Sequence, residues 1–282
     1  MKTALILEGG ASRTYFSCGV MDRLLELKIY FDYVIGVSAG ISFGVSYSSR
    51  QHKRNYRIMT EYQHKKEYAG AKHLFNKSNK SYYNLQYVFD EIPNHLLPFD
   101  YETFDNREGN CIAVVTNIVT GKAEYIEIPK DRKFTALRAS CALPLLFKPI
   151  EINGNFYMDG GISDSVPFEK AFADGCDKAL VLLTRPRGYV KGKEKATPLV
   201  KAAYKKYPEL LKSFLNRPEN YNNSMKRLAE LEKDGKAFVI APKNDLGVGR
   251  TERAPEKLKR IYEEGYGECR EVEARLKEFL EI

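Results

Sequence analysis

The first 49 residues alternate between short apolar runs and segments with helical spacing, and this alternation restricts the possible folds more than any other feature. Residues 3–7 and 31–37 are predicted strands. Each is followed by a glycine-containing turn and then by a predicted helix, over residues 15–27 and 39–49. Repetition of strand, turn and helix produces a parallel sheet covered by helices. The sequence therefore predicts an α/β protein.

The remaining elements are predicted from periodicity and turn residues. Further strands are expected over residues 112–119, 123–128, 149–152, 155–158, 178–184 and 237–241. Further helices are expected over residues 137–146 with a break near Pro144, and over 166–174, 199–215, 222–233, 255–266 and 269–279. Residues 51–110 are polar and contain only short predicted helices, so we interpret them as a surface excursion or lid.

The composition is that of a globular protein, with 43% hydrophobic and 29% charged residues. The opening residues carry too short an apolar run for a secretory signal, and no window approaches 18 uninterrupted apolar residues. We therefore expect a cytoplasmic protein. The five cysteines include no C-x-x-C pair, which favours free thiols over disulfides or a zinc site.

A formal net charge of +8 raises the question of an acidic partner. The basic residues are concentrated over 185–206, which contains eight of them and one glutamate. A solvated loop, contact at the periphery of an anionic membrane, and nucleic-acid binding are three interpretations of this stretch. No nucleic-acid-binding motif accompanies it, so no nucleic-acid partner is expected.

A serine framed by two glycines, Gly36-Val37-Ser38-Ala39-Gly40, lies between the second predicted strand and the helix that follows. This is the context of a G-x-S-x-G nucleophile elbow. The alternative is an ordinary strand-to-helix turn in which Ser38 caps the helix and the glycines allow close packing.

A nucleophilic serine needs a base, and histidine fits this sequence poorly. All four histidines lie between residues 52 and 95, whereas the α/β-hydrolase order places the histidine last. A carboxylate is the other choice. Asp159 ends a predicted strand and precedes two glycines, although an Asp-Gly turn without chemistry explains it equally well. Asp164 is a weaker candidate.

The glycine-rich turn after the first strand, LEGGASRTYF, is not a P-loop, because the pattern Gly-x-x-x-x-Gly-Lys does not fit it. It is not a dinucleotide fingerprint either, because Ala11 and Thr14 stand where glycines would be needed. Its backbone N–H groups at Gly9, Gly10 and Ala11 precede a helix and suit a developing oxyanion. Turns after neighbouring parallel strands share one edge of a sheet, so this loop is expected to face Ser38.

Three segments together resemble the bacterial patatin-like phospholipase family. They are EGGASRTYFSCGVMD at 8–22, IGVSAG at 35–40 and RASCALPLLFKPIEINGNFYMDGG at 138–161, and the similarity spans roughly residues 3–185. The resemblance implies a three-layer α/β/α fold with a mostly parallel central sheet. It also implies a catalytic domain over 1–185 and a mostly helical C-terminal region over 186–282, packed on or beside it.

The same resemblance implies a serine-aspartate dyad, with Ser38 as nucleophile and Asp159 as base. It assigns the oxyanion loop to residues 9–11 and a substrate-binding role to Arg13. Ser140, Pro144 and Pro149 match the family block that shapes the wall of the site. The implied activity is hydrolysis of lipid acyl esters, of the phospholipase A or lysophospholipase type, through an acyl-enzyme and without a metal or cofactor.

The chain departs from the family loop, Gly-Gly-Gly-x-Arg-Gly, at two places. Ala11 and Thr14 replace the third and last glycines, and a positive φ at Ala11 would cost roughly 1 kcal/mol or more. The alternative function is therefore a patatin-like module that binds lipid or protein with little or no turnover. For catalysis, Asp159 must be largely buried, since burial raises the pKa of an aspartate toward working pH.

Overall fold

The computed structural model describes residues 1–75, 81–130, 132–194 and 196–282, and these residues place eight strands in one sheet. The strands are β1 (Thr3–Leu7), β2 (Tyr33–Val37), β3 (Asn110–Asn117), β4 (Ala123–Glu127), β5 (Ile150–Ile152), β6 (Asn155–Asp159), β7 (Lys178–Leu182) and β8 (Ala237–Ile240). Their order is β5-β6-β3-β2-β1-β7-β8, with β4 paired to β3. Strands β3, β2, β1, β7 and β8 are parallel, so the sheet is mostly parallel, as predicted.

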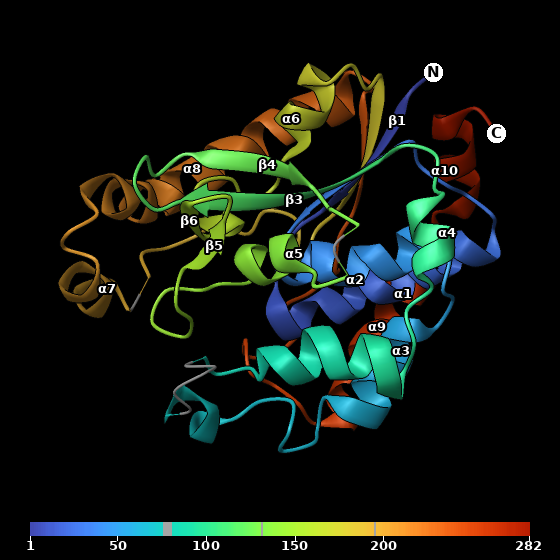
Figure 1. Cartoon of the computed structure of the whole chain (residues 1–282). Coiled ribbons are helices and arrows are strands. Elements are labelled where there is room, and N and C mark those ends of the chain that lie inside the picture. Colours follow the sequence, from blue (N-terminus) through green and yellow to red (C-terminus); the bar gives the residue numbers. More distant parts are fainter. Residues whose placement is uncertain (76–80, 131, 195) are drawn as a thin grey trace.

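Alternate residues of the central strands face two different layers of helices, because successive side chains of a strand point to opposite faces. The main covering helices are α1 (Tyr15–Glu26), α2 (Ala39–Ser48), α6 (Phe168–Ala173), α8 (Pro208–Lys233) and α9 (Pro255–Glu271). In β1, Leu5 and Leu7 pack into a core with α1, α2 and α9. Ala4 and Ile6 pack into a second core with α6 and α8. Figure 1 shows the sheet between these groups, which confirms the three-layer α/β/α architecture.

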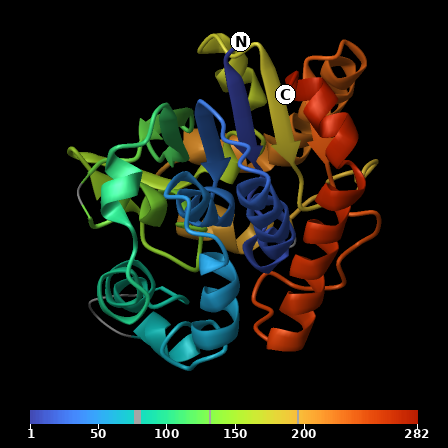
Figure 2. The same cartoon turned by 90° about the vertical axis from the view of Figure 1, so that its right-hand side faces the viewer.

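The C-terminal region joins the first half of the chain through the sheet and through a helix pair. Strand β8 pairs with β7 and extends the parallel sheet. Figure 2 shows α9 lying alongside α1, far from it in sequence. The two backbones approach closely because glycines face each other: a Cβ atom on Gly19 would lie 2.0 Å from the carbonyl oxygen of Tyr262, and one on Gly265 would lie 1.9 Å from that of Phe16.

We expect Gly265→Ala to destabilise the protein by about 2 kcal/mol or more, because the added methyl group meets the backbone of α1 and forces the helices apart. Gly267→Ala is the matched control, since this glycine lies on the same helix with no atom near its Cβ position. Removing a helical glycine there should stabilise by up to about 1 kcal/mol. Urea unfolding of both variants measures the difference, and equal midpoints would contradict the close packing.

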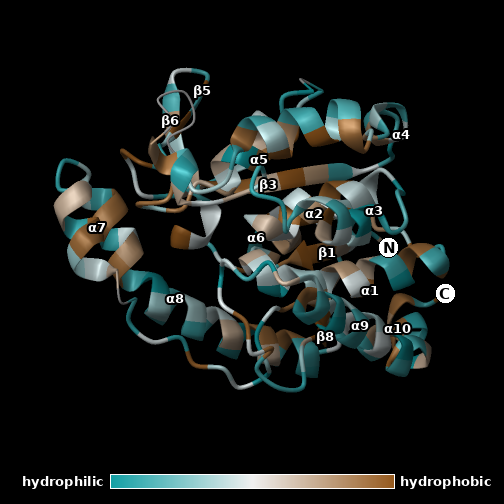
Figure 3. Cartoon of the chain, turned by 90° about the horizontal axis from the view of Figure 1, so that it is seen from below, coloured by the Kyte–Doolittle hydropathy of each residue, from teal (hydrophilic) through white to brown (hydrophobic). Residues whose placement is uncertain are grey.

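The long helix of the C-terminal region differs from the prediction. We expected helices over 199–215 and 222–233, whereas the structure has α7 (Thr197–Ala203) followed by a continuous α8. The break falls at Pro208, which occupies the first turn of α8, where a proline needs no N–H partner. Pro218 lies inside α8 without ending it. Figure 3 shows α8 mainly in hydrophilic colours against the hydrophobic β1 and β3, as expected of a helix with one buried face.

The excursion predicted over residues 51–110 consists of short helical segments, as expected, in its described residues. They are the α-helices α3 (Arg54–Arg57) and α4 (Tyr101–Asp105), the π-helices η2 (Ile58–Tyr62) and η4 (Tyr87–Leu96), and the 3-10 helix η3 (Ala71–Phe75). The remaining short elements are η1 (Ala11–Thr14), α5 (Thr135–Ser140), η5 (Gly160–Ile162) and α10 (Glu273–Leu280). Helix α5 ends at Ser140, six residues before the predicted end, and the chain then forms turns up to β5.

Candidate active site

The ends of two strands bring Ser38 and Asp159 together beside β3. Three residues of β3 pair with both β2 and β4, so β2 and β4 occupy opposite edges of β3. The next two pair with both β4 and β6, which places β6 on the same edge as β2. Along this edge β2 ends with Val37 opposite Val114, and the antiparallel β6 ends with Asp159 opposite Val115. The two strands therefore run toward each other and deliver both side chains to one point.

Ser38 occupies a strained turn between β2 and α2. Its backbone has φ 54° and ψ −129°, a conformation that costs a non-glycine residue about 1–3 kcal/mol. The Ser38 N–H donates a 2.8 Å hydrogen bond to the hydroxyl of Ser140, which holds the turn in place. A Cβ atom on Gly40 would lie 2.6 Å from the carbonyl oxygen of Leu7, so a glycine is required there. The turn has the strand-to-helix geometry that a nucleophile elbow requires.

Asp159 is buried, with 2% of its surface exposed, as expected. Its Oδ1 accepts a 2.8 Å hydrogen bond from the Gly161 N–H. Its Oδ2 is buried and has no hydrogen-bond partner among the described residues. Burial raises the pKa of Asp159, while the charge of Arg217 and the hydroxyl of Ser38 act in the opposite direction. Asp159 thus combines a raised pKa with an unused carboxylate oxygen.

The loop after β1 lies against both β2 and the chain after β7. A Cβ atom on Gly10 would lie 2.6 Å from the hydroxyl oxygen of Thr184, so this position requires glycine. Thr184 is fixed in turn by the buried carboxylate of Glu8, which accepts hydrogen bonds from its N–H (2.6 Å) and its hydroxyl (3.0 Å). The N–H groups of Gly9, Gly10 and Ala11 donate no hydrogen bond to any other described residue. They are therefore available to a bound oxygen.

The two departures from the family loop have different consequences. Ala11 adopts φ 49°, the left-handed region, so the strain expected at this position is present. Thr14 has φ −64° and ψ −12°, a conformation open to any residue, and its side chain is buried. Only the first replacement therefore strains the backbone.

An apolar cavity of about 120 Å³ opens on one side of Ser38. Its wall from the excursion is formed by Arg54, Ile58, Gln63, Tyr68, Tyr83, Leu85, Val88, Phe89, Ile92, Pro93 and Phe99. Its other wall comes mainly from α2 and from the segment between α5 and β5, including Leu143 and Phe147. These two residues flank Pro144, whereas Pro144 and Pro149 do not border the cavity themselves. The excursion thus covers an apolar space beside the predicted nucleophile.

A polar cavity opens on the other side, and Ala11, Ser38 and Leu143 border both cavities. The polar cavity is also bordered by Gly9, Gly10, Asp159 and Gly161, and by the cationic side chains of Arg13, Arg185, Lys191, Arg217 and Arg250. Of these five cationic residues, the sequence prediction included only Arg13 in the site. Arg217 and Arg250 were missed because they lie in the C-terminal region, where no motif indicated a role.

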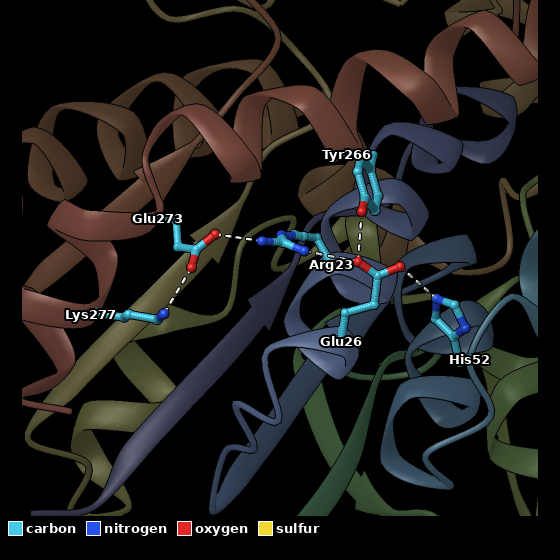
Figure 4. Close-up of polar contacts among 6 residues, drawn as sticks. All are labelled: Arg23, Glu26, His52, Tyr266, Glu273 and Lys277. Carbon is cyan, nitrogen blue, oxygen red and sulfur yellow. Dashed lines mark hydrogen bonds and ion pairs between the residues drawn. The ribbon is translucent and has the colours of Figure 1, made fainter.

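The histidines and Asp164 lie away from this site. The four histidines would be expected on the polar surface if none of them acts as the base. His52, His64 and His95 are exposed, whereas His73 is buried and contacts the carbonyl of Lys66 at 3.0 Å, so this expectation is wrong for His73. Figure 4 shows His52 beside Glu26, in a polar cluster that links α1 to α9 and α10. Asp164 accepts a hydrogen bond from Tyr125 at 3.0 Å and borders neither cavity. Of the candidate bases, Asp159 is the one beside Ser38.

The described residues were also compared with the requirements of a metal site and of a membrane-spanning helix. No group of three or more His, Cys, Asp or Glu side chains in this part of the chain could hold a metal ion. Among the described helices, none combines the length and apolar character that crossing a membrane requires.

Two curated proteins are similar to this chain in sequence. The chain is 26% identical over 191 residues to the uncharacterised protein YjjU of Escherichia coli K12, covering 66% of this chain and 52% of YjjU. It is 28% identical over 183 residues to the probable lipid hydrolase 463L of Invertebrate iridescent virus 6, covering 59% of this chain and 62% of that protein. The chain therefore spans between about half and three fifths of these curated relatives.

Among solved structures, VipD from Legionella pneumophila matches 96% of this chain and 66% of its own, with a TM-score of 0.48 and 13% identity. A family model described as a domain of unknown function, DUF6363, matches residues 207–281. The model of the patatin-like phospholipases matches residues 5–172, more than half of the sequence. The chain belongs to the patatin-like phospholipase family.

Proposed function

We propose that the protein hydrolyses lipid acyl esters, with Ser38 as nucleophile and Asp159 as its base. The observation that carries this proposal is the position of Ser38, on a strained turn where an apolar and a polar cavity meet. A lipid ester has the same division, since its carbonyl joins an acyl chain to a polar alcohol. Family membership and the name of the viral relative, a probable lipid hydrolase, support the same reaction class.

In the first step, the Ser38 oxygen bonds to the ester carbonyl carbon while Asp159 Oδ2 takes the hydroxyl proton. The carbonyl oxygen becomes an oxyanion, which the N–H groups of Gly9, Gly10 and Ala11 stabilise, since these groups donate to no acceptor in the described part of the chain. The ester C–O bond then breaks, and the alcohol leaves with the proton from Asp159. An acyl-enzyme on Ser38 remains.

In the second step, water attacks the acyl-enzyme. Asp159 accepts a proton from the water as its oxygen bonds to the carbonyl carbon, and the same N–H groups again stabilise the oxyanion. The bond to Ser38 breaks, the serine oxygen regains the proton, and the fatty acid leaves. The raised pKa of Asp159 assists both steps, because a carboxylate with a higher proton affinity is a stronger base.

The two cavities divide the substrate between them. We place the acyl chain in the apolar cavity under the excursion and the alcohol part in the polar cavity, beside Arg13. In this arrangement residues 1–185 provide the reacting groups, and residues 186–282 provide part of the polar wall. The exposed lysines of the basic stretch, Lys201, Lys205 and Lys206, then provide peripheral contact with anionic membranes.

A fluorophosphonate probe and a series of acyl esters test this proposal on the purified full chain. Covalent labelling together with fatty-acid release, measured by mass spectrometry, is the expected result. If the protein takes no label and releases no fatty acid from phospholipid, lysophospholipid, acylglycerol or short synthetic esters, it is a binding module instead. The loss of turnover would then be attributed to the strained Ala11 in the oxyanion loop.

Arg217 should control the pH dependence of the reaction. Its charge lowers the pKa of Asp159, so Arg217→Gln raises that pKa, and the freed charge of Glu194 acts in the same direction. Since the base must be unprotonated, the acidic limb of kcat/KM against pH should move to higher pH. Arg227→Gln, on an exposed part of the same helix, is the control and should leave the limb in place. An unshifted limb in Arg217→Gln would contradict the role of Asp159.

A further inference from the structure

One charged side chain, that of Arg54, stands among the described residues that border the apolar cavity. It lies at the start of α3 and is buried, with 6% of its surface exposed. Burial lowers the pKa of Arg54 to about 10, so the guanidinium group stays charged at neutral pH. Burying a charge costs free energy unless hydrogen bonds and an opposite charge replace the lost water. A cation in a cavity for hydrocarbon is therefore costly unless it has partners.

The protein provides partners for only part of the Arg54 guanidinium group. Its Nη2 donates a 2.8 Å hydrogen bond to the carbonyl of Leu97, and its central carbon lies 5.4 Å from the centre of the Phe99 ring. Its Nε is buried and has no hydrogen-bond partner among the described residues. After burial, the strongest influences on its charge come from three tyrosines and Arg57, and no described carboxylate pairs with it. The group therefore keeps its positive charge and an N–H group without a partner.

Tyr68 supplies a second polar group without a partner on the same wall. Its side chain is buried and borders the cavity, and its hydroxyl forms no hydrogen bond with a described residue. Burial raises the pKa of Tyr68, so the hydroxyl stays a neutral donor, and the charge of Arg54 reaches it. Ser12 and Gln63 border the cavity as well, but Ser12 donates to two carbonyls of the loop after β8, and Gln63 accepts from Tyr15. The unpaired donors thus come from the excursion.

The start of α3 is fixed against α2, along which the apolar cavity extends. Phe43 and Val45 of α2 border the cavity, so it follows this helix away from Ser38. The side chain of Asn55, next to Arg54, donates a 3.0 Å hydrogen bond to the carbonyl of Phe43. Phe43 follows Ser38 by five residues, or about 7.5 Å along a helix axis. Arg54 is therefore held at a set distance from the predicted nucleophile, beside the far part of a bound acyl chain.

We propose that Arg54, assisted by Tyr68, binds a carboxylate at the far end of the acyl chain, so that the enzyme prefers esters of dicarboxylic acids to esters of simple fatty acids. This inference rests on the proposed function, because it assigns a class of acyl chain to the same site. A carboxylate accepts N–H groups of a guanidinium and neutralises its charge. A methyl end in the same place excludes water from Arg54 and offers no acceptor. Oxidative cleavage of an unsaturated acyl chain is a reaction that supplies such carboxylates.

The test compares two esters whose acyl chains have the same length, mono(4-nitrophenyl) suberate and 4-nitrophenyl octanoate, at neutral pH and at concentrations at which both are monomeric. We expect the unmodified full chain to have the higher kcat/KM for the suberate ester. Arg54→Met should lower that value about tenfold or more, the usual effect of losing a charge-assisted hydrogen bond. The same variant should keep or raise kcat/KM for the octanoate ester. Arg54→Lys keeps the charge and should retain part of the preference.

Two further variants separate carboxylate binding from a structural role of Arg54. Arg57→Met is the matched control, because Arg57 is exposed on the same helix, pairs with Glu61 and does not border the cavity. It should leave the ratio of the two kcat/KM values unchanged. Tyr68→Phe removes only a hydroxyl and should lower the ratio about fivefold, which keeps the inference testable if Arg54→Met does not fold. A loosened excursion would change both substrates alike, whereas loss of the carboxylate contact affects only the suberate ester.

The length of the acyl chain gives a second readout. Arg54 is fixed relative to Ser38, so only some chains can place a carboxylate beside it. Mono(4-nitrophenyl) esters of glutaric, suberic and dodecanedioic acid are each compared with the monocarboxylic ester of the same length. We expect the preference for the carboxylate to depend on chain length. An equal preference at all three lengths would contradict a fixed subsite.

The outcomes separate this inference from the proposed function. Absence of turnover on every ester would overturn both. Turnover without a preference for the suberate ester, or a ratio unchanged in Arg54→Met, would overturn only the carboxylate subsite. Free octanoate serves as a competing source of the same group. Inhibition by octanoate that depends on Arg54, without a preference for the suberate ester, would mean that the site takes a free carboxylate, which also contradicts the role in acyl-chain selection.

Discussion

Replacing Ser38 with alanine is expected to lower kcat by about 10⁴-fold or more, because loss of a nucleophilic serine leaves only the stabilisation by the surrounding groups. Labelling by a fluorophosphonate should disappear in the same variant. Hydrolysis of a short acyl ester, followed at saturating substrate, gives the rate, and mass spectrometry of the intact protein gives the labelling. Retained labelling would show that another residue is the nucleophile.

A control and a stability measurement accompany this variant. Ser46 is buried on α2, the helix that follows Ser38, and borders neither cavity, so Ser46→Ala should keep both labelling and turnover. Ser38→Gly should be as inactive as Ser38→Ala but more stable by about 1 kcal/mol, since glycine adopts a positive φ without strain. Equal inactivity of the two variants would show that turnover depends on the Ser38 hydroxyl group. The higher stability of Ser38→Gly would show that the strain lies in the backbone at this position.

Replacing Asp159 with asparagine is expected to lower kcat by about 10³-fold, within the range attributed to general-base catalysis. Asparagine has nearly the same shape, and its oxygen can accept the hydrogen bond that Gly161 donates to Oδ1. The fold should therefore persist, and the loss should come from the missing base. Steady-state kinetics with urea unfolding of the same preparation separates the two effects.

Asp164→Asn is the matched control, because Asp164 is also an aspartate with a pKa raised by burial and lies five residues further along the chain. It contacts Tyr125 rather than Ser38, and turnover should stay close to that of the unmodified protein. Full activity in Asp159→Asn would contradict the dyad and would direct attention to another proton acceptor.

The fold was predictable in outline because its signals are local. Apolar runs marked the strands, including those expected over 149–152 and 155–158. These two strands form the β5-β6 hairpin, and the residues between them, Asn153 and Gly154, both have positive φ. The errors lie in helix boundaries, at the end of α5 and in the C-terminal region. Two helices were expected over 199–215 and 222–233, whereas packing of the buried face of α8 on the sheet keeps that helix continuous.

The candidate site was predictable only in part. Ser38 stands in a recognisable motif, the loop at residues 9–11 was a candidate from its position after the first strand, and Asp159 was a candidate from the two glycines that follow it. The family resemblance then implied the dyad. The meeting of β2 and β6 on one edge of β3 depends on strand register, which a single sequence does not display. Arg217 and Arg250 reach the cavity from segments without a motif, so only the tertiary arrangement identifies them.

The contact between the two glycine-bearing helices has a consequence for experiments with shortened chains. A fragment cut at the end of the family match, residue 172, would lose β7, the sheet neighbour of β1, and α9, which covers α1. Buried aromatic residues such as Phe16 would then face water. Chimeras and crystallisation trials should therefore keep the segments before and after residue 172 together, since neither segment buries its own hydrophobic core.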